Sequence, residues 1–167
     1  MLRVLAVPLL LALAAACADP SAAAYRSVAR DGLVLTLSAS PAAVTPGDTV
    51  RLVARLANHN AHPVRLDFSS GCQVLPYVLG PGGKTVYPYG GGWGCFAALT
   101  HLELAPGEVK ETAYSWTAQS YAYDAQKGGP VYSPLPAGSY LAHAALNGTL
   151  NGARIELRSN AETVQVR

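Results

Sequence analysis

The chain has 167 residues, of which 50% are hydrophobic and 13% charged, and its formal net charge is +2. This composition excludes a disordered chain, which combines low hydrophobicity with high net charge. The lack of a Lys/Arg run disfavours a nucleic-acid partner, because phosphate binding needs clustered cations. The length predicts one domain, and the abundant glycine and proline predict short strands joined by turns.

The first residues are typical of a secretory signal peptide. Arg3 gives a positive start, and an apolar run from Val4 to Ala16 is too short to cross a bilayer as a helix. The small residues before Cys17 resemble a bacterial lipobox, in which the cysteine is acylated and becomes the mature N-terminus. We therefore predict a signal peptide over 1–16, a lipid on Cys17 and a tether over 17–31. An ordinary signal peptide cleaved after one of the alanines is the alternative.

The cysteine count supports this interpretation. The chain has three cysteines, and an odd cysteine in an exported protein needs an explanation. Lipidation of Cys17 leaves Cys72 and Cys95, which we expect to form a disulfide in an oxidising compartment. That bond closes a loop of about 24 residues and stabilises the fold by ~3 kcal/mol in the chain-entropy model. A metal site at these two cysteines is disfavoured, because the spacing is not CxxC.

Short runs of alternating apolar and polar residues predict strands with one buried face. The predicted strands lie at 33–38, 50–56, 64–68, 73–79, 84–89, 100–104, 109–117 and 140–146, with further alternation at 155–157 and 164–166. Turn signals separate them at 44–48, 58–63, 80–83, 105–108 and 147–152. Such spacing predicts an all-β fold, a sandwich of two antiparallel sheets over 32–167.

One long segment, 118–135, interrupts this pattern with Gly-Gly-Pro at 128–130. It is either an excursion with a structure of its own or a functional loop.

The order of the motifs resembles the BsuPI-type intracellular proteinase-inhibitor domain. The motifs are Val-Thr-Pro-Gly-Asp-Thr-Val at 44–50, Leu-Asp-Phe-Ser-Ser-Gly-Cys at 66–72, Gly-Lys-Thr-Val-Tyr at 83–87, Leu-Ala-Pro-Gly-Glu at 104–108 and Pro-Ala-Gly-Ser-Tyr at 136–140. This resemblance covers about residues 33–166 and implies an immunoglobulin-like β-sandwich of about 7–9 strands. The family name implies proteinase inhibition, whereas the export signal and the segment 118–135 depart from an intracellular inhibitor.

Several motifs that resemble catalytic or metal sites are incomplete. Gly-Gly-Lys-Thr at 82–85 lacks the first glycine of a phosphate loop and precedes a predicted strand, so we expect a hairpin turn. His101 and Glu103 lack the Pro-Cys-x-x-Cys of a zinc deaminase. His59 and His62 lie in a turn without a nearby third ligand. We therefore expect no catalytic residues, no metal and no cofactor, although a dispersed triad leaves a hydrolase as an alternative.

The aromatic residues are the best candidates for a binding surface. Tyr87, Tyr89 and Trp93 lie in a glycine-rich stretch before Cys95, and the long segment carries Tyr121, Tyr123 and Tyr132, of which the first two are the preferred candidates. Tyrosine and tryptophan offer large contact areas at low entropic cost. Alternatively, these rings pack at the edge of the core.

The preferred function is a non-enzymatic binding module, anchored by its lipid to the cell membrane or outer envelope, with a proteinase or an envelope protein as its partner. The alternative is a proteinase inhibitor that acts through an exposed loop near the disulfide, since a preorganised loop loses less entropy on binding. A structural envelope protein is a third possibility.

The anchor is directly testable. Cys17→Ser removes the acylation site, so we expect the protein to move from the membrane to the soluble fraction on cell fractionation. An unmodified Cys17 in the mass spectrum of the wild-type protein, or membrane association that survives the substitution, contradicts the lipoprotein interpretation.

Overall fold

The computed structural model describes residues 29–167, which contain thirteen strands. Ten of them lie where the sequence alternates, whereas β2, β9 and β10 were not predicted. The predicted signal peptide, Cys17 and most of the predicted tether lie outside this range. No helix within it is long and apolar enough to cross a membrane. The strands are β1 (Leu33–Ser40), β2 (Ala43–Val44), β3 (Thr49–Asn58), β4 (Val64–Phe68), β5 (Val74–Leu79), β6 (Thr85–Tyr87), β7 (Thr100–Leu104), β8 (Val109–Thr117), β9 (Gln119–Asp124), β10 (Gly129–Pro134), β11 (Gly138–Leu150), β12 (Ala153–Arg158) and β13 (Glu162–Val166).

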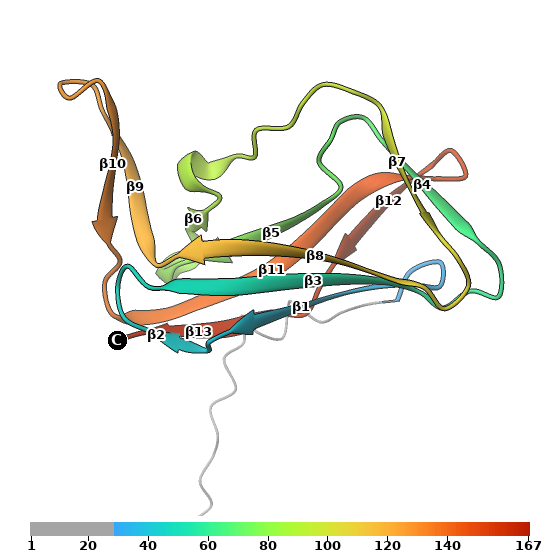
Figure 1. Ribbon diagram of the computed structural model, residues 1–167, viewed down its shortest axis with the longest axis horizontal. Helices are drawn as coiled ribbons and strands as arrows, with labels where there is room; N and C mark the ends of the chain where they lie inside the picture. Colours follow the sequence, from blue (N-terminus) through green and yellow to red (C-terminus); the bar gives the residue numbers. More distant parts are fainter. Residues whose placement is uncertain (1–28) are drawn as a thin grey trace, which may run out of the picture.

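These strands form two facing sheets and a separate hairpin (Figure 1). The smaller sheet has the order β1-β3-β8, and the larger one β2-β13-β11-β4-β7, to which β5, β6 and β12 add. Long β11 pairs along its length with β13, β5, β12 and β4, so it organises the larger sheet. All pairings are antiparallel except that of β2 with β13, which is parallel.

The core lies between the two sheets. Strand β3 buries Val50, Leu52 and Leu56 on one face, as the alternation predicted. Across the sandwich, Trp116 and Tyr140 are both buried, with ring centroids 5.9 Å apart. The predicted all-β, immunoglobulin-like β-sandwich is confirmed.

Two turn predictions need correction. The turn predicted at 147–152 is largely strand, because β11 continues to Leu150 and pairs there with both β12 and β4. Only Asn151 and Gly152 make the turn, and both have positive φ. The turn predicted at 44–48 begins one residue later, because Val44 belongs to β2 and pairs with Val166 of β13. In both places, pairing with a distant strand overrides the local turn composition.

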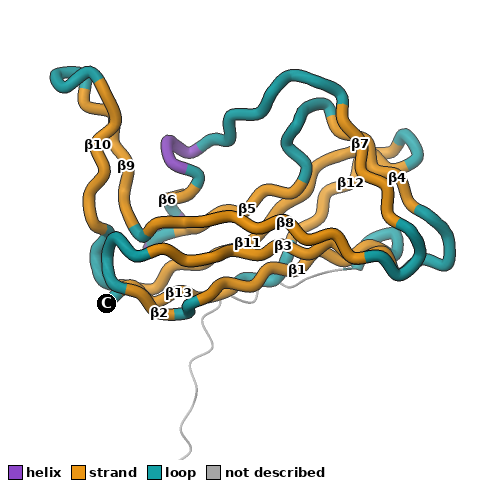
Figure 2. Tube along the Cα trace, viewed as in Figure 1, coloured by secondary structure: helices purple, strands orange, loops and turns teal. Residues whose placement is uncertain are grey.

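The segment 118–135 is a β-hairpin of its own, formed by β9 and β10, which projects from one end of the sandwich (Figure 2). Buried Ala118 and Leu135 anchor its base. The N–H of Ala118 donates to Asp48 O at 2.8 Å, and Ala118 O accepts from Gly47 N–H at 3.0 Å. The hairpin therefore leaves the sandwich from a fixed base.

The Gly-Gly-Lys-Thr motif lies in the turn between β5 and β6. The N–H of Gly80 donates to Lys84 O at 2.8 Å, and Gly82 and Gly83 both have positive φ. Strand β6 follows, so the expected hairpin turn is confirmed.

A buried asparagine closes the turn between β3 and β4. The Asn58 side chain donates from Nδ2 to the carbonyl oxygens of His62, Leu104 and Ala105, each at 3.1 Å. Its Oδ1 accepts from the Asn60 N–H at 2.9 Å. One side chain thereby pairs backbone groups from two loops that would otherwise be unsatisfied.

Replacing Asn58 by Ala should lower the free energy of unfolding by about 3 kcal/mol, because buried carbonyl groups lose their donor. Chemical denaturation measures the change. Asn60→Ala is the matched control, since this side chain is less buried and makes fewer such bonds, and should cost less than about 1 kcal/mol. Equal losses for the two variants would contradict this account.

Candidate functional site

A chain of aromatic rings runs from the sandwich to the projecting hairpin. We call the following residues the aromatic cluster: Tyr87, Tyr89, Trp93, Tyr114, Tyr121 and Tyr132. The Trp93 ring meets Tyr114 at 5.5 Å and Tyr87 at 5.3 Å between centroids, both edge to face. Tyr89 meets Tyr87 and Tyr132 in the same way, each at 5.5 Å. Edge-to-face geometry is favourable for rings at these separations.

The inner half of the cluster packs on the core. Tyr87 is buried, and Tyr89 and Trp93 are half-buried against core residues. The Tyr89 hydroxyl donates to Thr117 O at 2.7 Å, and that of Tyr114 donates to Val74 O. Burial is the main reason that the pKa values of Tyr87, Tyr89 and Tyr114 lie above the ordinary tyrosine value.

The outer half of the cluster lies on the hairpin. Tyr121 and Tyr132 are opposite each other in the β9–β10 register, and Tyr123 is opposite Pro130. Because opposite residues of an antiparallel pair share a face, these four side chains form one surface, the hairpin face. Its tyrosines are exposed by 36% at Tyr121, 49% at Tyr132 and 65% at Tyr123.

A pocket of about 480 Å³ lies beside the cluster, between the base of the hairpin and the β5–β6 turn. Tyr121 forms one of its walls, and the buried Tyr140 and Leu135 also line it. Its remaining wall includes Gly90 and Gly91, which turn the chain with positive φ. This pocket is large enough to take a side chain of a bound partner next to the hairpin face.

The predicted disulfide between Cys72 and Cys95 is present, with a Cα–Cα distance of 5.5 Å. It holds one end of an exposed loop over residues 94–99, in which Phe96 is exposed by 66% and Leu99 by 88%. The Phe96 ring lies over Gly71, where a Cβ would come within 2.1 Å of it. The N–H of Gly71 donates to Phe96 O at 3.0 Å. Both the disulfide and this contact fix the start of the loop.

The structure brings four of the five predicted surface residues into one cluster and places the fifth, Tyr123, on the same hairpin. Tyr87 is buried and Trp93 is half-buried against the core. For these two residues, the alternative interpretation from the sequence, packing at the edge of the core, is the correct one. Tyr132, an aromatic residue of the same segment that was not among the five, lies opposite Tyr121 and joins the cluster. A binding role for this surface stays a prediction.

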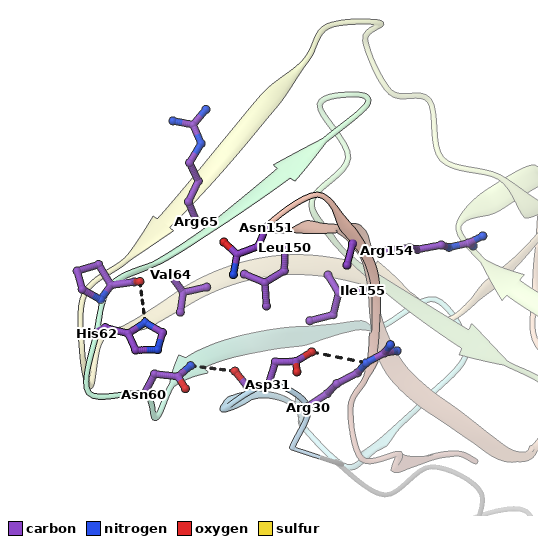
Figure 3. A pocket seen from close by; sticks show the side chains of 12 residues that line it. Arg30, Asp31, Asn60, His62, Val64, Arg65, Leu150, Asn151, Arg154 and Ile155 are labelled. Carbon is purple, nitrogen blue, oxygen red and sulfur yellow. Dashed lines mark hydrogen bonds and ion pairs between the residues drawn. The ribbon is translucent and has the colours of Figure 1, made fainter.

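Another cavity, of about 590 Å³, lies at the opposite end of the sandwich (Figure 3). Val64, Leu150 and Ile155 form its apolar floor. Two of its three arginines are paired within the chain, since Arg30 lies 3.8 Å from Asp31 and Arg65 is bound to Asp67 and Glu103. Arg154 is the third. Within residues 29–167, no three histidine, cysteine or acidic side chains are arranged so that they could hold a metal ion.

The two facing sheets with their short connections define an immunoglobulin-like β-sandwich domain. The chain belongs to the BsuPI family, described as intracellular proteinase inhibitor, whose model matches residues 37–150. No curated protein sequence matches the chain.

Similar solved structures share little sequence with this chain. A β-glucosidase from Erythrobacter marinus is 13% identical over 81% of this chain and 15% of its own, with a TM-score of 0.47. The CARDB domain of a Pyrococcus furiosus protein is 14% identical over 81% of this chain and 87% of its own, with a TM-score of 0.45. A sporulation control protein from Bacillus subtilis is 11% identical over 83% and 50%, with a TM-score of 0.47. The chain thus spans a small part of the β-glucosidase.

Trp93 and Tyr123 should differ sharply in their effect on stability. Trp93→Ala removes two ring contacts and should lower the free energy of unfolding by about 2–3 kcal/mol, less than for a fully buried aromatic. Trp93→Phe keeps a ring there and should cost less than about 1 kcal/mol, partly because the buried Nε1 has no hydrogen-bond partner to lose. Tyr123→Ala should change stability by less than about 0.5 kcal/mol. Denaturation in urea measures all three, and a near-neutral Trp93→Ala would show that the ring does not support the fold.

Proposed function

We propose that this protein is a non-enzymatic binding module, exported and held at the cell envelope by a lipid on Cys17, and that it captures a protein partner with the hairpin face. Membership of an inhibitor family supports a non-enzymatic role. The apolar N-terminal run, the small residues before Cys17 and a disulfide elsewhere in the chain support export.

The observation that carries the proposal is the separation of roles among the aromatic rings. Tyr87 and Trp93 support the surface from beneath, while Tyr121, Tyr123 and Tyr132 are displayed on it. A rigid base reduces the entropy lost on binding, and exposed tyrosines are typical of interaction hot spots. The adjoining pocket offers a place for one anchoring side chain of the partner.

The proposal is tested by affinity capture from an envelope extract, with Tyr123→Ala and Phe96→Ala as a matched pair. Both rings are about two-thirds exposed, and they lie on different surfaces. We expect Tyr123→Ala to weaken retention of the captured protein at least tenfold and Phe96→Ala to leave it unchanged. Retention that is insensitive to Tyr123→Ala contradicts a binding role for the hairpin face.

Proteinase inhibition is the second candidate, favoured by the family and by the exposed loop 94–99 beside the disulfide. Phe96 is not suited to be the residue at the scissile position. Its carbonyl oxygen already accepts hydrogen bonds from Gly71 at 3.0 Å and Ala98 at 3.1 Å, whereas a proteinase must bind that oxygen in its oxyanion hole. Leu99, the most exposed apolar side chain of the loop, is the better contact residue.

Titration of a panel of purified proteinases distinguishes the two candidates. Inhibition predicts a stoichiometric loss of activity that Leu99→Ala weakens and Tyr123→Ala does not. Activity that persists at excess protein for every proteinase removes this candidate and leaves the hairpin-face proposal intact.

A further inference from the structure

Two sheet edges of this molecule, β1 and β7, are closed at least in part by its own side chains. An open edge offers unpaired backbone groups to any other strand, and proteins usually cover or shorten such edges. On β1, the Asn160 side chain donates to Leu37 O at 3.0 Å and accepts from the Leu37 N–H at 2.9 Å. Arg30 and Leu33 also exchange two backbone hydrogen bonds beside that strand. The β1 edge is therefore blocked.

The edge strands of the larger sheet are shorter than β8. Strand β2 has two residues, β7 has five, and β12, which pairs with β11 alone in the described residues, has six. The Thr100 hydroxyl of β7 donates to Ser70 O at 2.7 Å, and His101 O accepts from the Gln73 side chain at 3.3 Å. Little of the β7 edge is left to pair.

Strand β8 differs from these edges, because it is nine residues long and pairs with β3 alone in the described part of the chain. Backbone hydrogen bonds join Asn58 to Glu108 at one end of the β3–β8 pair and Ala118 to Asp48 at the other, and the register between them is unbroken. Because hydrogen-bonded pairs alternate along an antiparallel pair of strands, the N–H and C=O groups of the even-numbered residues of β8 point toward β3. The N–H and C=O groups of Val109, Glu111, Ala113 and Ser115 consequently point outward. The open run ends at Thr117, whose carbonyl oxygen accepts from the Tyr89 hydroxyl.

Unpaired charges on an edge strand discourage pairing with another strand, but the charged residues of β8 are in ion pairs. Lys110 lies 3.3 Å from Glu108, and Glu111 lies 2.8 Å from Arg55 on β3. Each of these charges is thus paired within its own copy. The middle of the edge, at Thr112 and Ala113, is exposed and uncharged.

We propose that a second copy of this chain pairs with the β8 edge, antiparallel and about a two-fold axis at Thr112. In this register Val109 faces Ser115 of the second copy and Glu111 faces its Ala113, so all four outward residues find partners. The two three-stranded sheets then join as one continuous six-stranded sheet. Such an isologous contact is the commonest arrangement of a homodimer.

Charge and side-chain complementarity favour a second copy as the occupant. The two-fold register places Thr112 opposite Thr112, a favourable cross-strand pair. It also places Lys110 opposite Tyr114 of the second copy, whose ring packs with Trp93 at 5.5 Å and offers a cation–π contact. No two like charges are directly opposed in this register. The part of β8 whose edge is unpaired and the part that pairs with itself in this register are the same seven residues, 109–115.

The first experiment is sedimentation velocity on the whole protein with substitutions at Thr112. Wild type should show a concentration-dependent dimer, and Thr112→Val should keep it. Thr112→Lys should abolish it, because two ammonium groups then face each other across the axis. At a concentration low enough for the wild type to be monomeric as well, the thermal midpoint of Thr112→Lys should equal that of the wild type, since the side chain is exposed in one copy. A wild type that stays monomeric into the high micromolar range, or a Thr112→Lys variant that remains dimeric, overturns the proposal.

The second experiment tests the register. Cysteines opposite each other in a non-hydrogen-bonded antiparallel pair are close enough to form a disulfide. With oxidised glutathione as oxidant, Thr112→Cys should yield a covalent dimer at least tenfold faster than Thr49→Cys, because Thr49 is exposed on β3, opposite Thr117 and outside the proposed contact 109–115. Equal rates overturn the register, and neither result depends on Tyr123 or the hairpin face.

Discussion

Edge-to-face contacts between aromatic rings are the constraint that joins the projecting hairpin to the sandwich. An isolated two-stranded hairpin is marginal in water, so β9 and β10 need support from outside themselves. Tyr89 supplies it, because its ring contacts Tyr87 on the sandwich side and Tyr121 and Tyr132 on the hairpin side. Its hydroxyl is fixed to the end of β8. The glycine-rich stretch that follows is held at its other end by the disulfide at Cys95.

The sandwich could be predicted from the sequence, because its strands bury one face and therefore alternate. The hairpin β9–β10 could not be predicted in this way. Its face carries tyrosines rather than aliphatic residues and is not buried in the core, so the apolar–polar alternation of a half-buried strand is missing. Asn147 and Gly148 resemble a turn in composition, yet they lie within β11. Gly148 is needed there because a Cβ would come within 2.9 Å of Asp67 O on the neighbouring strand. The close approach of β4 to Gly148 is a long-range contact, so the sequence around Gly148 does not reveal it.

The site was predictable in composition but not in exposure. The sequence grouped Tyr87, Tyr89 and Trp93 by their glycine-rich surroundings, which cannot tell a ring packed on the core from a ring in solvent. In the structure Tyr87 is buried and Tyr89 and Trp93 are half-buried, whereas the exposed tyrosines lie on the hairpin. The hairpin face and the β8 edge remain separate surfaces, so a dimer through β8 is compatible with a partner on each hairpin. A lipid tether would favour such a weak contact by confining both copies to one surface.

The central claim is that the aromatic cluster holds the hairpin in a fixed position on the sandwich. Amide hydrogen exchange, compared between wild type and Tyr89→Leu, measures this directly. Loss of the Tyr89 ring should accelerate exchange throughout β9 and β10 by at least tenfold while the amides of β3 and β11 keep their protection. Unchanged exchange in the hairpin would contradict the account, because it would show that β9 and β10 hold their structure without the cluster.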